Sequence, residues 1–193
     1  MSKFLCQACG AITAGYDIVH FGSDGDVYRD LCTACFNTEM AKRVGLHQFE
    51  NVRLEPVQIA DCDGAMHEFH FRTRLLGDIL SLEGFELIKG EPAGYQFQLV
   101  GNAEEELFSL LGRLIQKIRR SLSVKHIAHD QRGQYIVDTI VRGRIEWDEA
   151  KEGRMPQVLV DGRTFSWEEL GEMLMAFEGW QFKLEIFDPS DEV

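Results

Sequence analysis

Four cysteines in two matched pairs constrain this chain more than any other feature. Cys6 and Cys9 form the first pair and Cys32 and Cys35 the second, with two residues inside each pair. Two residues between thiolates let a tight turn aim both sulfurs at one ion, and two such turns supply the four soft ligands of a tetrahedral site. In a reducing compartment such pairs are typical of metal ligands rather than disulfides. We therefore expect these four cysteines to bind one structural zinc ion.

The alternative for the cysteines is a redox dithiol. A thioredoxin-like Cys-x-x-Cys sits between a strand and a helix, and the first pair lacks that setting.

With four protein ligands the zinc site is closed, so no coordination position is left for water or substrate. The sequence therefore favours a structural role for the metal.

The order of elements around the cysteines is the second indication of a zinc module. Residues 16–21 and 27–31 are rich in strand formers and flank the turn residues 22–26, which predicts a hairpin. Residues 36–44 (FNTEMAKRV) have helical composition and stop at Gly45. Knuckle, hairpin, knuckle and helix in this order resemble the treble-clef class, over residues 1 to about 45. Treble clefs serve DNA-, RNA- and protein-binding surfaces alike, so the resemblance leaves the partner open.

The rest of the chain is long enough for one further domain. A total of 193 residues with 45% hydrophobic and 27% charged side chains is typical of a soluble protein with a small module and one medium domain. We place the zinc-binding module at residues 1–48 and an α+β domain at residues 49–193. We expect this domain to hold a mainly antiparallel sheet with two helices.

Alternating apolar and polar residues predict the strands of this domain. The segments are 51–59, 66–75, 85–88, 95–100, 135–147, 157–160, which enters a turn at Asp161 and Gly162, and, last, 180–186. In the segment 135–147, Tyr135, Ile145 and Trp147 are predicted to face the core.

Two capping patterns predict the helices. Asn102 followed by Glu105 is typical of a helix start, and seven apolar residues at helical spacing follow up to Leu122. Ser166 with Glu169 predicts a second helix that ends at Gly179.

Three stretches of the domain resemble an uncharacterised bacterial family of unknown function, over residues from about 60 to 188. They are 142–148 (RGRIEWD), 161–171 (DGRTFSWEELG) and 177–186 (FEGWQFKLEI). The resemblance supplies no residue roles. The chain has no Gly-rich phosphate loop and no nucleophile elbow.

Two clusters of titratable residues are candidates for a second site. Asp61, Asp63, His67 and His70, with Cys62, lie within ten residues and would suit a metal-dependent hydrolase. On a strand, however, His67 and His70 project to opposite faces, so we favour a polar turn followed by a half-buried strand with a packed Cys62. His126 and His129 follow the long helix, where cations also complement the helix dipole.

Charge is segregated along the chain. Residues 102–145 hold 8 basic and 5 acidic side chains, whereas residues 146–193 hold 4 and 13, within a net charge of −12. Five cations in the basic segment suit phosphate, nucleic acid or an acidic protein segment: Arg113, Lys117, Arg120, Arg142 and Arg144. Neutralisation by the chain's own carboxylates is the alternative, and the net charge disfavours polyanions.

We expect a non-enzymatic zinc protein that binds another macromolecule, most readily a protein. Nucleic-acid binding through the zinc module and the basic residues, and a hydrolase centred on residues 61–70, are the alternatives. No apolar run approaches the roughly 18–20 residues needed to cross a bilayer, and residues 1–6 contain no hydrophobic signal core. We therefore expect a cytoplasmic protein with no membrane partner.

Overall fold

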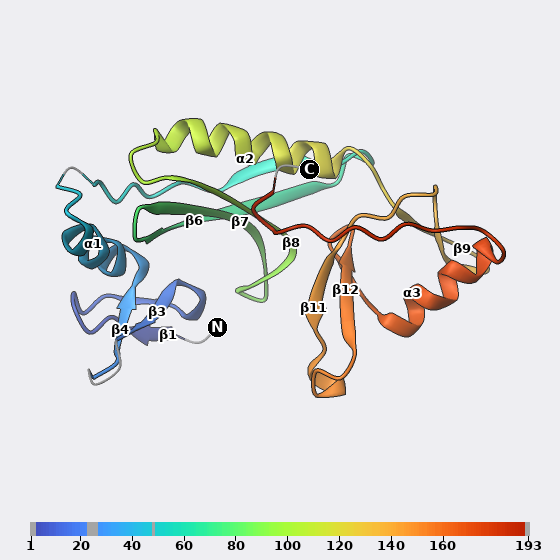
Figure 1. Cartoon of the computed structure of the whole chain (residues 1–193), viewed down its shortest axis with the longest axis horizontal. Coiled ribbons are helices and arrows are strands. Elements are labelled where there is room, and N and C mark those ends of the chain that lie inside the picture. The colour runs from blue at the N-terminus through green and yellow to red at the C-terminus, as the bar shows by residue number, and fades with distance from the viewer. Residues whose placement is uncertain (1–2, 23–26, 48, 192–193) are drawn as a thin grey trace.

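The chain folds as an α+β protein built from antiparallel strands and helices (Figure 1). The computed structural model describes residues 3–22, 27–47 and 49–191. Three parts follow one another along the chain, and each has its own cluster of buried apolar side chains. The predicted fold class, an α+β domain preceded by a small cysteine-bearing module, is confirmed.

The N-terminal part is a knuckle, a strand pair and a helix. Strands β1 and β2 pair around the first two cysteines, and β3 and β4 pair before the helix. Most of the turn predicted between β3 and β4, residues 23–26, lies outside the described residues. The elements are β1 (Lys3–Leu5), β2 (Ile12–Ala14), a short 3-10 turn η1 (Gly15–Asp17), β3 (Ile18–Phe21), β4 (Arg29–Cys32) and α1 (Thr33–Val44).

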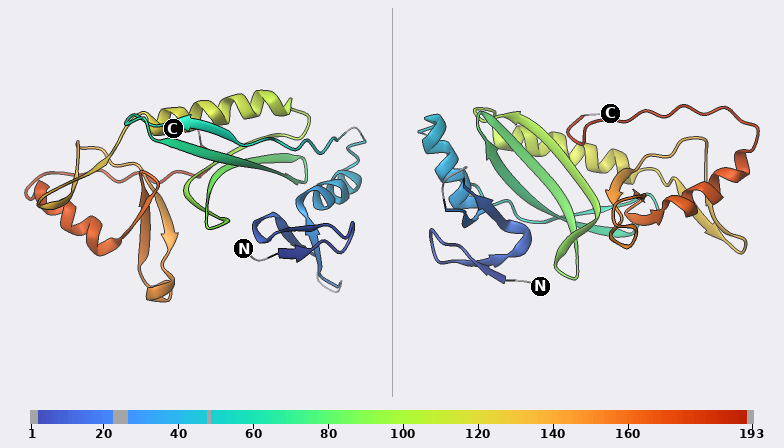
Figure 2. Two further views of the ribbon diagram at one scale, coloured as in Figure 1. Left: turned by 180° about the vertical axis from the view of Figure 1, so that it is seen from behind. Right: turned by 60° about the horizontal axis from the view of Figure 1, so that its bottom comes forward.

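The middle part is a four-stranded antiparallel sheet with one helix. The strands lie in the order β5-β6-β7-β8, which is also their order along the chain. One face is covered along its length by the helix (Figures 1 and 2). The elements are β5 (Val57–Ala60), β6 (Met66–Leu76), β7 (Ile79–Ile88), β8 (Glu91–Asn102) and α2 (Leu107–Leu122).

Helix α2 and the sheet form the largest apolar core. The helix buries one side chain per turn, namely Leu110, Leu114, Ile118 and Leu122, against strand residues that include Phe69, Leu82 and Leu99. Gly84 on β7 allows the close approach, because a Cβ there would lie 3.3 Å from side-chain carbons of both Leu114 and Ile118. The alternation of β6 places its odd-numbered residues on this face and its even-numbered residues on the other.

The C-terminal part holds a hairpin, a three-stranded sheet and a helix. Strands β9 (Ile127–Asp130) and β10 (Gly133–Ile136) form the hairpin. The sheet has the order β11-β12-β13, and α3 follows β13 directly. Its elements are β11 (Arg144–Trp147), the 3-10 turn η2 (Glu149–Lys151), β12 (Pro156–Val160), β13 (Arg163–Ser166), α3 (Trp167–Leu174) and the 3-10 turn η3 (Met175–Phe177).

One of the two predicted caps is confirmed and the other is wrong. Ser166 and Glu169 form a reciprocal capping box at the start of α3. Asn102, by contrast, ends β8, and its carboxamide oxygen accepts the amide of Glu104 in a local turn. The N-cap of α2 is Glu106, and Glu105 is free to pair with Arg113. Asn side chains stabilise turns as readily as caps, and the sequence pattern does not separate the two.

Two predicted strands are wrong in the C-terminal part, and one in the middle part is shorter. Residues 135–147 do not form one strand, and the side chains of Tyr135, Ile145 and Trp147 are exposed rather than in the core. Residues 180–186, expected to form the last strand, are extended but unpaired. Of the predicted strand 51–59 only residues 57–59 are paired, in β5, which continues to Ala60. Alternating apolar and polar residues show only that a segment has one face suited to packing on a core. A strand also needs a neighbouring strand that pairs with its backbone N–H and C=O groups.

No helix among the described residues is long and apolar enough to cross a membrane. The predicted boundary between residues 48 and 49 stays a prediction. The apolar side chains after it gather in two separate clusters, one within residues 49–122 and one within residues 127–177.

Candidate metal centre

The first cysteine pair lies on a tight turn between β1 and β2. The amide of Cys6 donates to Ala11 at 2.9 Å, and the amide of Gly10 donates back to the Cys6 carbonyl at 2.9 Å. Gly10 has φ +72°, a conformation that side chains disfavour, and so the turn needs a glycine there. Gln7 ties the turn to β4, since its amide donates to the Asp30 carbonyl and its side chain accepts the Asp30 amide.

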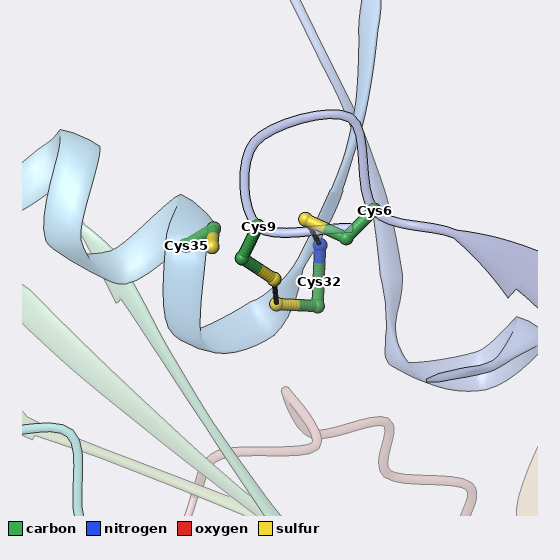
Figure 3. A group of neighbouring side chains, drawn as sticks. All are labelled: Cys6, Cys9, Cys32 and Cys35. Atoms are coloured by element: carbon green, nitrogen blue, oxygen red, sulfur yellow. Dashed lines mark hydrogen bonds between the residues drawn. The ribbon is translucent and has the colours of Figure 1, made fainter. Parts of the chain in front are cut away.

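The second pair lies at the start of helix α1. Cys32 is the N-cap residue and Cys35 belongs to the first turn, so the positive end of the helix dipole faces the sulfurs (Figure 3). The amide of Cys32 also donates to the Cys6 sulfur at 3.2 Å. Backbone N–H groups aimed at sulfur favour the thiolate, which is the form that binds metal.

The four sulfurs come close enough to share one ion. All lie within 4.8 Å of one another, and the sulfurs of Cys9 and Cys32 are 3.9 Å apart. In a tetrahedral site with metal–sulfur bonds of about 2.3 Å, the sulfurs are roughly 3.8 Å apart. The donor set and its spacing therefore fit a tetrahedral metal ion. Within the described parts of the chain, no other group of three or more His, Cys, Asp or Glu side chains is this close.

The thiols do not share one pKa. Burial raises the pKa of Cys6, but the backbone amides of Cys32, Cys9 and Ala8 outweigh it and bring the value down to about 6. Burial, together with the neighbouring thiols, raises the pKa of Cys35, and burial also raises that of Cys32. Without a cation, four thiolates this close would repel one another, so a metal would stabilise the charged form of all four.

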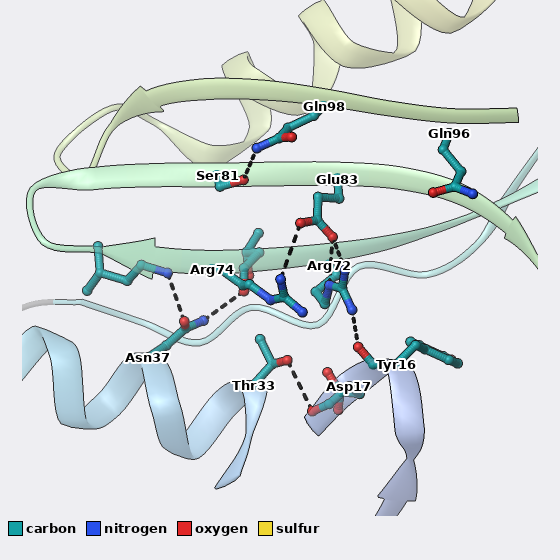
Figure 4. Close-up of polar contacts among 12 residues, drawn as sticks. Tyr16, Asp17, Thr33, Asn37, Arg72, Arg74, Ser81, Glu83, Gln96 and Gln98 are labelled. Carbon is teal, nitrogen blue, oxygen red and sulfur yellow. Dashed lines mark hydrogen bonds and ion pairs between the residues drawn. The ribbon is translucent and has the colours of Figure 1, made fainter. Parts of the chain in front are cut away.

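Asn37 on α1 connects this cysteine module to the sheet of the middle part. Its side chain is almost fully buried, and its amide nitrogen donates to the Thr73 carbonyl at 3.0 Å (Figure 4). Its oxygen accepts the Leu75 amide at 2.9 Å. Both backbone groups belong to the edge of β6 beyond the end of β5, so one side chain takes the place of a neighbouring strand.

A row of polar residues lies beneath the module on the sheet face opposite α2. Arg72 forms an ion pair with Glu83 and donates to the backbone carbonyl of Tyr16 in the module (Figure 4). Tyr16 also packs edge-on against Phe85 with 5.4 Å between ring centres. A hollow of about 240 Å³ opens on the same face, lined in part by Arg72, Glu83, Gln96, Arg144 and Pro189.

The titratable group around residue 61 forms a network of ion pairs. The buried carboxylate of Asp61 lies 2.7 Å from the Lys125 nitrogen and 3.4 Å from Nε2 of His67. It also accepts the amides of Asp63 and Ala65 and thereby closes the turn before β6. The other ring nitrogen of His67 lies 2.8 Å from Glu86. The Lys125 ammonium is the main cause that lowers the pKa of Asp61.

Four other candidate residues are placed apart from that network. His70 lies 3.0 Å from Glu68 and stacks on Phe85, so it shares no partner with His67. Cys62 is exposed rather than packed. His126 lies in the loop after α2, where its Nδ1 lies 2.9 Å from the Ile140 carbonyl oxygen, and His129 is an exposed residue of β9.

Three of the five basic residues singled out from the sequence contact groups of the chain itself. Arg113 pairs with Glu105 at 2.9 Å, and Arg144 contacts Glu146 and Gln96. Lys117 donates to the carbonyls of Gln98, Pro189 and Asp191, so it fastens the C-terminal residues to the middle part. Arg120 and Arg142 are exposed.

Sequence reasoning missed Asn37, Arg72 and Glu83. Arg72 lies on the polar face of an alternating segment, so the pattern does indicate a solvated or a docking face. The buried asparagine carries no signal in the sequence, because its partners are backbone groups 36 and 38 residues away along the chain.

Three family models match successive segments of the chain. Residues 5–47 match the Domain of unknown function (DUF7685), residues 50–123 the Domain of unknown function (DUF7686) and residues 125–191 the Domain of unknown function (DUF7713). The comparisons with curated proteins and with solved structures find no match. The predicted resemblance to a family of unknown function agrees with these matches.

Replacement of Asn37 by Ala tests the docking contact. We expect Asn37→Ala to lower the free energy of unfolding by about 1–3 kcal/mol, because the Thr73 carbonyl and the Leu75 amide lose their partner. Urea unfolding measures the loss, and hydrogen exchange at the Leu75 amide should accelerate. The exposed Lys42→Ala is the matched control on the same helix. Unchanged exchange at Leu75 would contradict the docking role.

Acid titration tests the Asp61 network. Because the folded-state pKa of Asp61 lies below its unfolded value, the carboxylate stabilises the fold above pH of about 4, and this contribution is lost as the pH falls through the folded pKa. We expect Asp61→Asn to be destabilised at pH 7, with the difference from the wild type shrinking below about pH 4. Urea unfolding along a pH series measures this, with Asp78→Asn, an exposed position outside the network, as control. A difference that stays constant with pH would contradict the charge assignment.

Proposed function

We propose that this protein is a zinc-stabilised protein-binding module with no catalytic role for the metal. The four-cysteine cluster, with two sulfurs on a knuckle and two at a helix start, supports a treble-clef-like zinc finger. Four thiolates complete the coordination of zinc, so the ion would hold the module together and would not activate water. Thiolates at such a site stay reduced in the cytoplasm, where we place the protein.

The metal would supply folding free energy that the module's small apolar core does not provide. The buried apolar cluster of this part consists of Cys6, Leu31, Cys32 and Phe36, so half of it is made of the ligands themselves. Structural zinc contributes roughly 10–16 kcal/mol to small modules of this kind. The bound module then covers part of the polar sheet face through Asn37 and Arg72.

Exposed apolar side chains in the C-terminal part are the observation that carries the protein-binding proposal. Solvent-exposed apolar residues are normal when scattered, but a concentration of them is typical of interaction surfaces. Here they include four alternating residues of one unpaired segment, namely Trp180, Phe182, Leu184 and Ile186. Ile145 and Trp147 on β11 and Leu174 and Met175 at the end of α3 are also exposed.

A protein partner fits this surface better than nucleic acid does. The segment from residue 146 onward holds 13 acidic and 4 basic side chains, which repel phosphates. Three of the five cations that were candidates for phosphate binding, Arg113, Lys117 and Arg144, contact groups of the chain itself.

Metal analysis of Cys32→Ser tests the zinc assignment. Serine is a favourable N-cap, so Cys32→Ser removes one ligand without weakening the helix-capping position itself. We expect the wild type to hold one zinc per chain and Cys32→Ser to lose it together with the fold of residues 5–47. Elemental analysis and circular dichroism measure the two losses. Cys62→Ser, outside the cluster, is the control, and one zinc retained by Cys32→Ser would refute the ligand assignment.

Photo-crosslinking in the source cell tests the binding surface. A photoreactive amino acid at position 182 should form covalent adducts with protein. The same group at the exposed polar position 154, in the loop before β12, should form far fewer. Adducts with nucleic acid, or equal labelling from both positions, would count against the proposal.

A further inference from the structure

The segment of residues 180–187 has the character of a strand but no neighbour. Its apolar side chains alternate with Gln181, Lys183 and Glu185, and the side chain of Phe182 is 90% exposed. Within the described residues, no backbone hydrogen bond involves residues 181–187. An extended chain with free backbone groups and one apolar face is the kind of segment that adds to the edge of a sheet.

Strand β11 offers such an edge on the same molecule. It pairs with β12 on one side and with nothing among the described residues on the other. Val160 and Arg163 close the two-residue hairpin between β12 and β13, and this sets the alternation of hydrogen-bonded pairs across the sheet. The backbone groups of Ile145 and the N–H of Trp147 therefore point to the outer edge of β11. The Trp147 carbonyl already accepts a hydrogen bond from the side chain of Gln157 on β12.

The side chains of β11 show which face a new strand would extend. Ile145 lies beside Val158, and Val158 lies beside Phe165, so the three form one row across the sheet. Val158 and Phe165 are buried in the cluster that includes Met173 of α3, but Ile145 is exposed. The apolar face of this sheet therefore extends beyond the part covered by α3 and reaches the open edge at β11.

We propose that residues 180–187 of one chain add as an antiparallel strand to β11 of a second copy, and that two copies exchange these segments reciprocally. This inference rests on the proposed protein-binding function and names its partner. Each copy would both donate a strand and accept one, which closes the assembly as a two-fold dimer.

Charge and apolar pattern match in one register. With Leu184 opposite Ile145 and Phe182 opposite Trp147, the apolar row is lengthened. On the other face, Glu185 then lies opposite Arg144 and Lys183 opposite Glu146.

Other registers are penalised. A shift of two residues in one direction places Lys183 opposite Arg144, and in the other direction it places Glu185 opposite Glu146. A shift of one residue moves the apolar side chains to the polar face. Complementarity on both faces therefore selects a single pairing.

The path of the segment in its own chain favours exchange over self-pairing. Residues 180–187 follow η3 and run toward α2 without lying along β11 (Figures 1 and 2). Lys117 holds the residues beyond them through the carbonyls of Pro189 and Asp191. In this arrangement Lys183 pairs with Glu185 of its own segment, and Arg144 with Glu146 of its own strand, so both charge pairs are free to rearrange on exchange.

Two charge reversals test the exchange by light scattering of the full chain. We expect the wild type to be a dimer and Glu146→Lys and Lys183→Glu each to weaken dimerisation by about tenfold or more, because each places like charges opposite one another at two sites. Mixing the two variants should restore the dimer, since the altered β11 of one then meets the altered segment of the other. Glu178→Lys, just outside the segment, is the control.

The outcomes separate this inference from the proposed function. A wild-type monomer, or two variants that do not associate when mixed, would overturn the exchange. A monomer that still crosslinks from position 182 to another protein would overturn the exchange and retain the proposed function. A wild-type monomer that forms no such adducts would overturn both the strand exchange and the proposed protein-binding function.

Discussion

The packing of α2 on one face of the four-stranded sheet is the contact on which the other parts depend. It buries four helix side chains in a continuous apolar stripe, and Gly84 lets the helix approach closely. With one face of the sheet covered, the other face and the edges remain for docking. The cysteine module uses the β6 edge through Asn37, and the C-terminal residues are held by Lys117 of α2 itself. The cysteine module and the C-terminal residues thus both attach to the middle part, whose core contains no residue from either of them.

The cysteine module docks mainly through backbone groups and an ion pair, with one aromatic contact between Tyr16 and Phe85. Asn37 satisfies a carbonyl and an amide of β6, and Arg72 reaches the Tyr16 carbonyl while it stays paired with Glu83. Within the C-terminal part, the carboxylate of Asp161 accepts the amides of His126 and Ile127, the residues that lead from α2 into β9. Each such contact adds little to the free energy of unfolding, but a buried polar group left without a partner costs more. These contacts therefore determine how the parts are positioned more than they add to stability. This fits a chain with three separate apolar clusters.

The charge pattern takes a different meaning in three dimensions. In the sequence, the basic middle segment suggests a surface that binds a polyanion, whereas the acidic C-terminal segment would repel one. In the fold, Arg113 and Arg144 have carboxylates within reach, and Lys117 is surrounded by backbone carbonyls. The unusual surface is instead apolar and extended, at residues 180–187. Alternation there predicted a strand. The pattern is present, but the segment pairs with no other strand among the described residues.

The sequence by itself determined the local features. The spacing of Cys6, Cys9, Cys32 and Cys35 needs only two turns to bring each pair together, and the Ser166 capping box and the apolar stripe of α2 are also formed within a few residues. Only the tertiary structure decided which faces and edges meet. Asn37 finds partners 36 and 38 residues away, Asn102 ends a strand rather than starting a helix, and the segment 180–187 lies unpaired. The reason is that a local pattern specifies which groups need a partner, whereas the partners are supplied by chain segments whose approach depends on the whole fold.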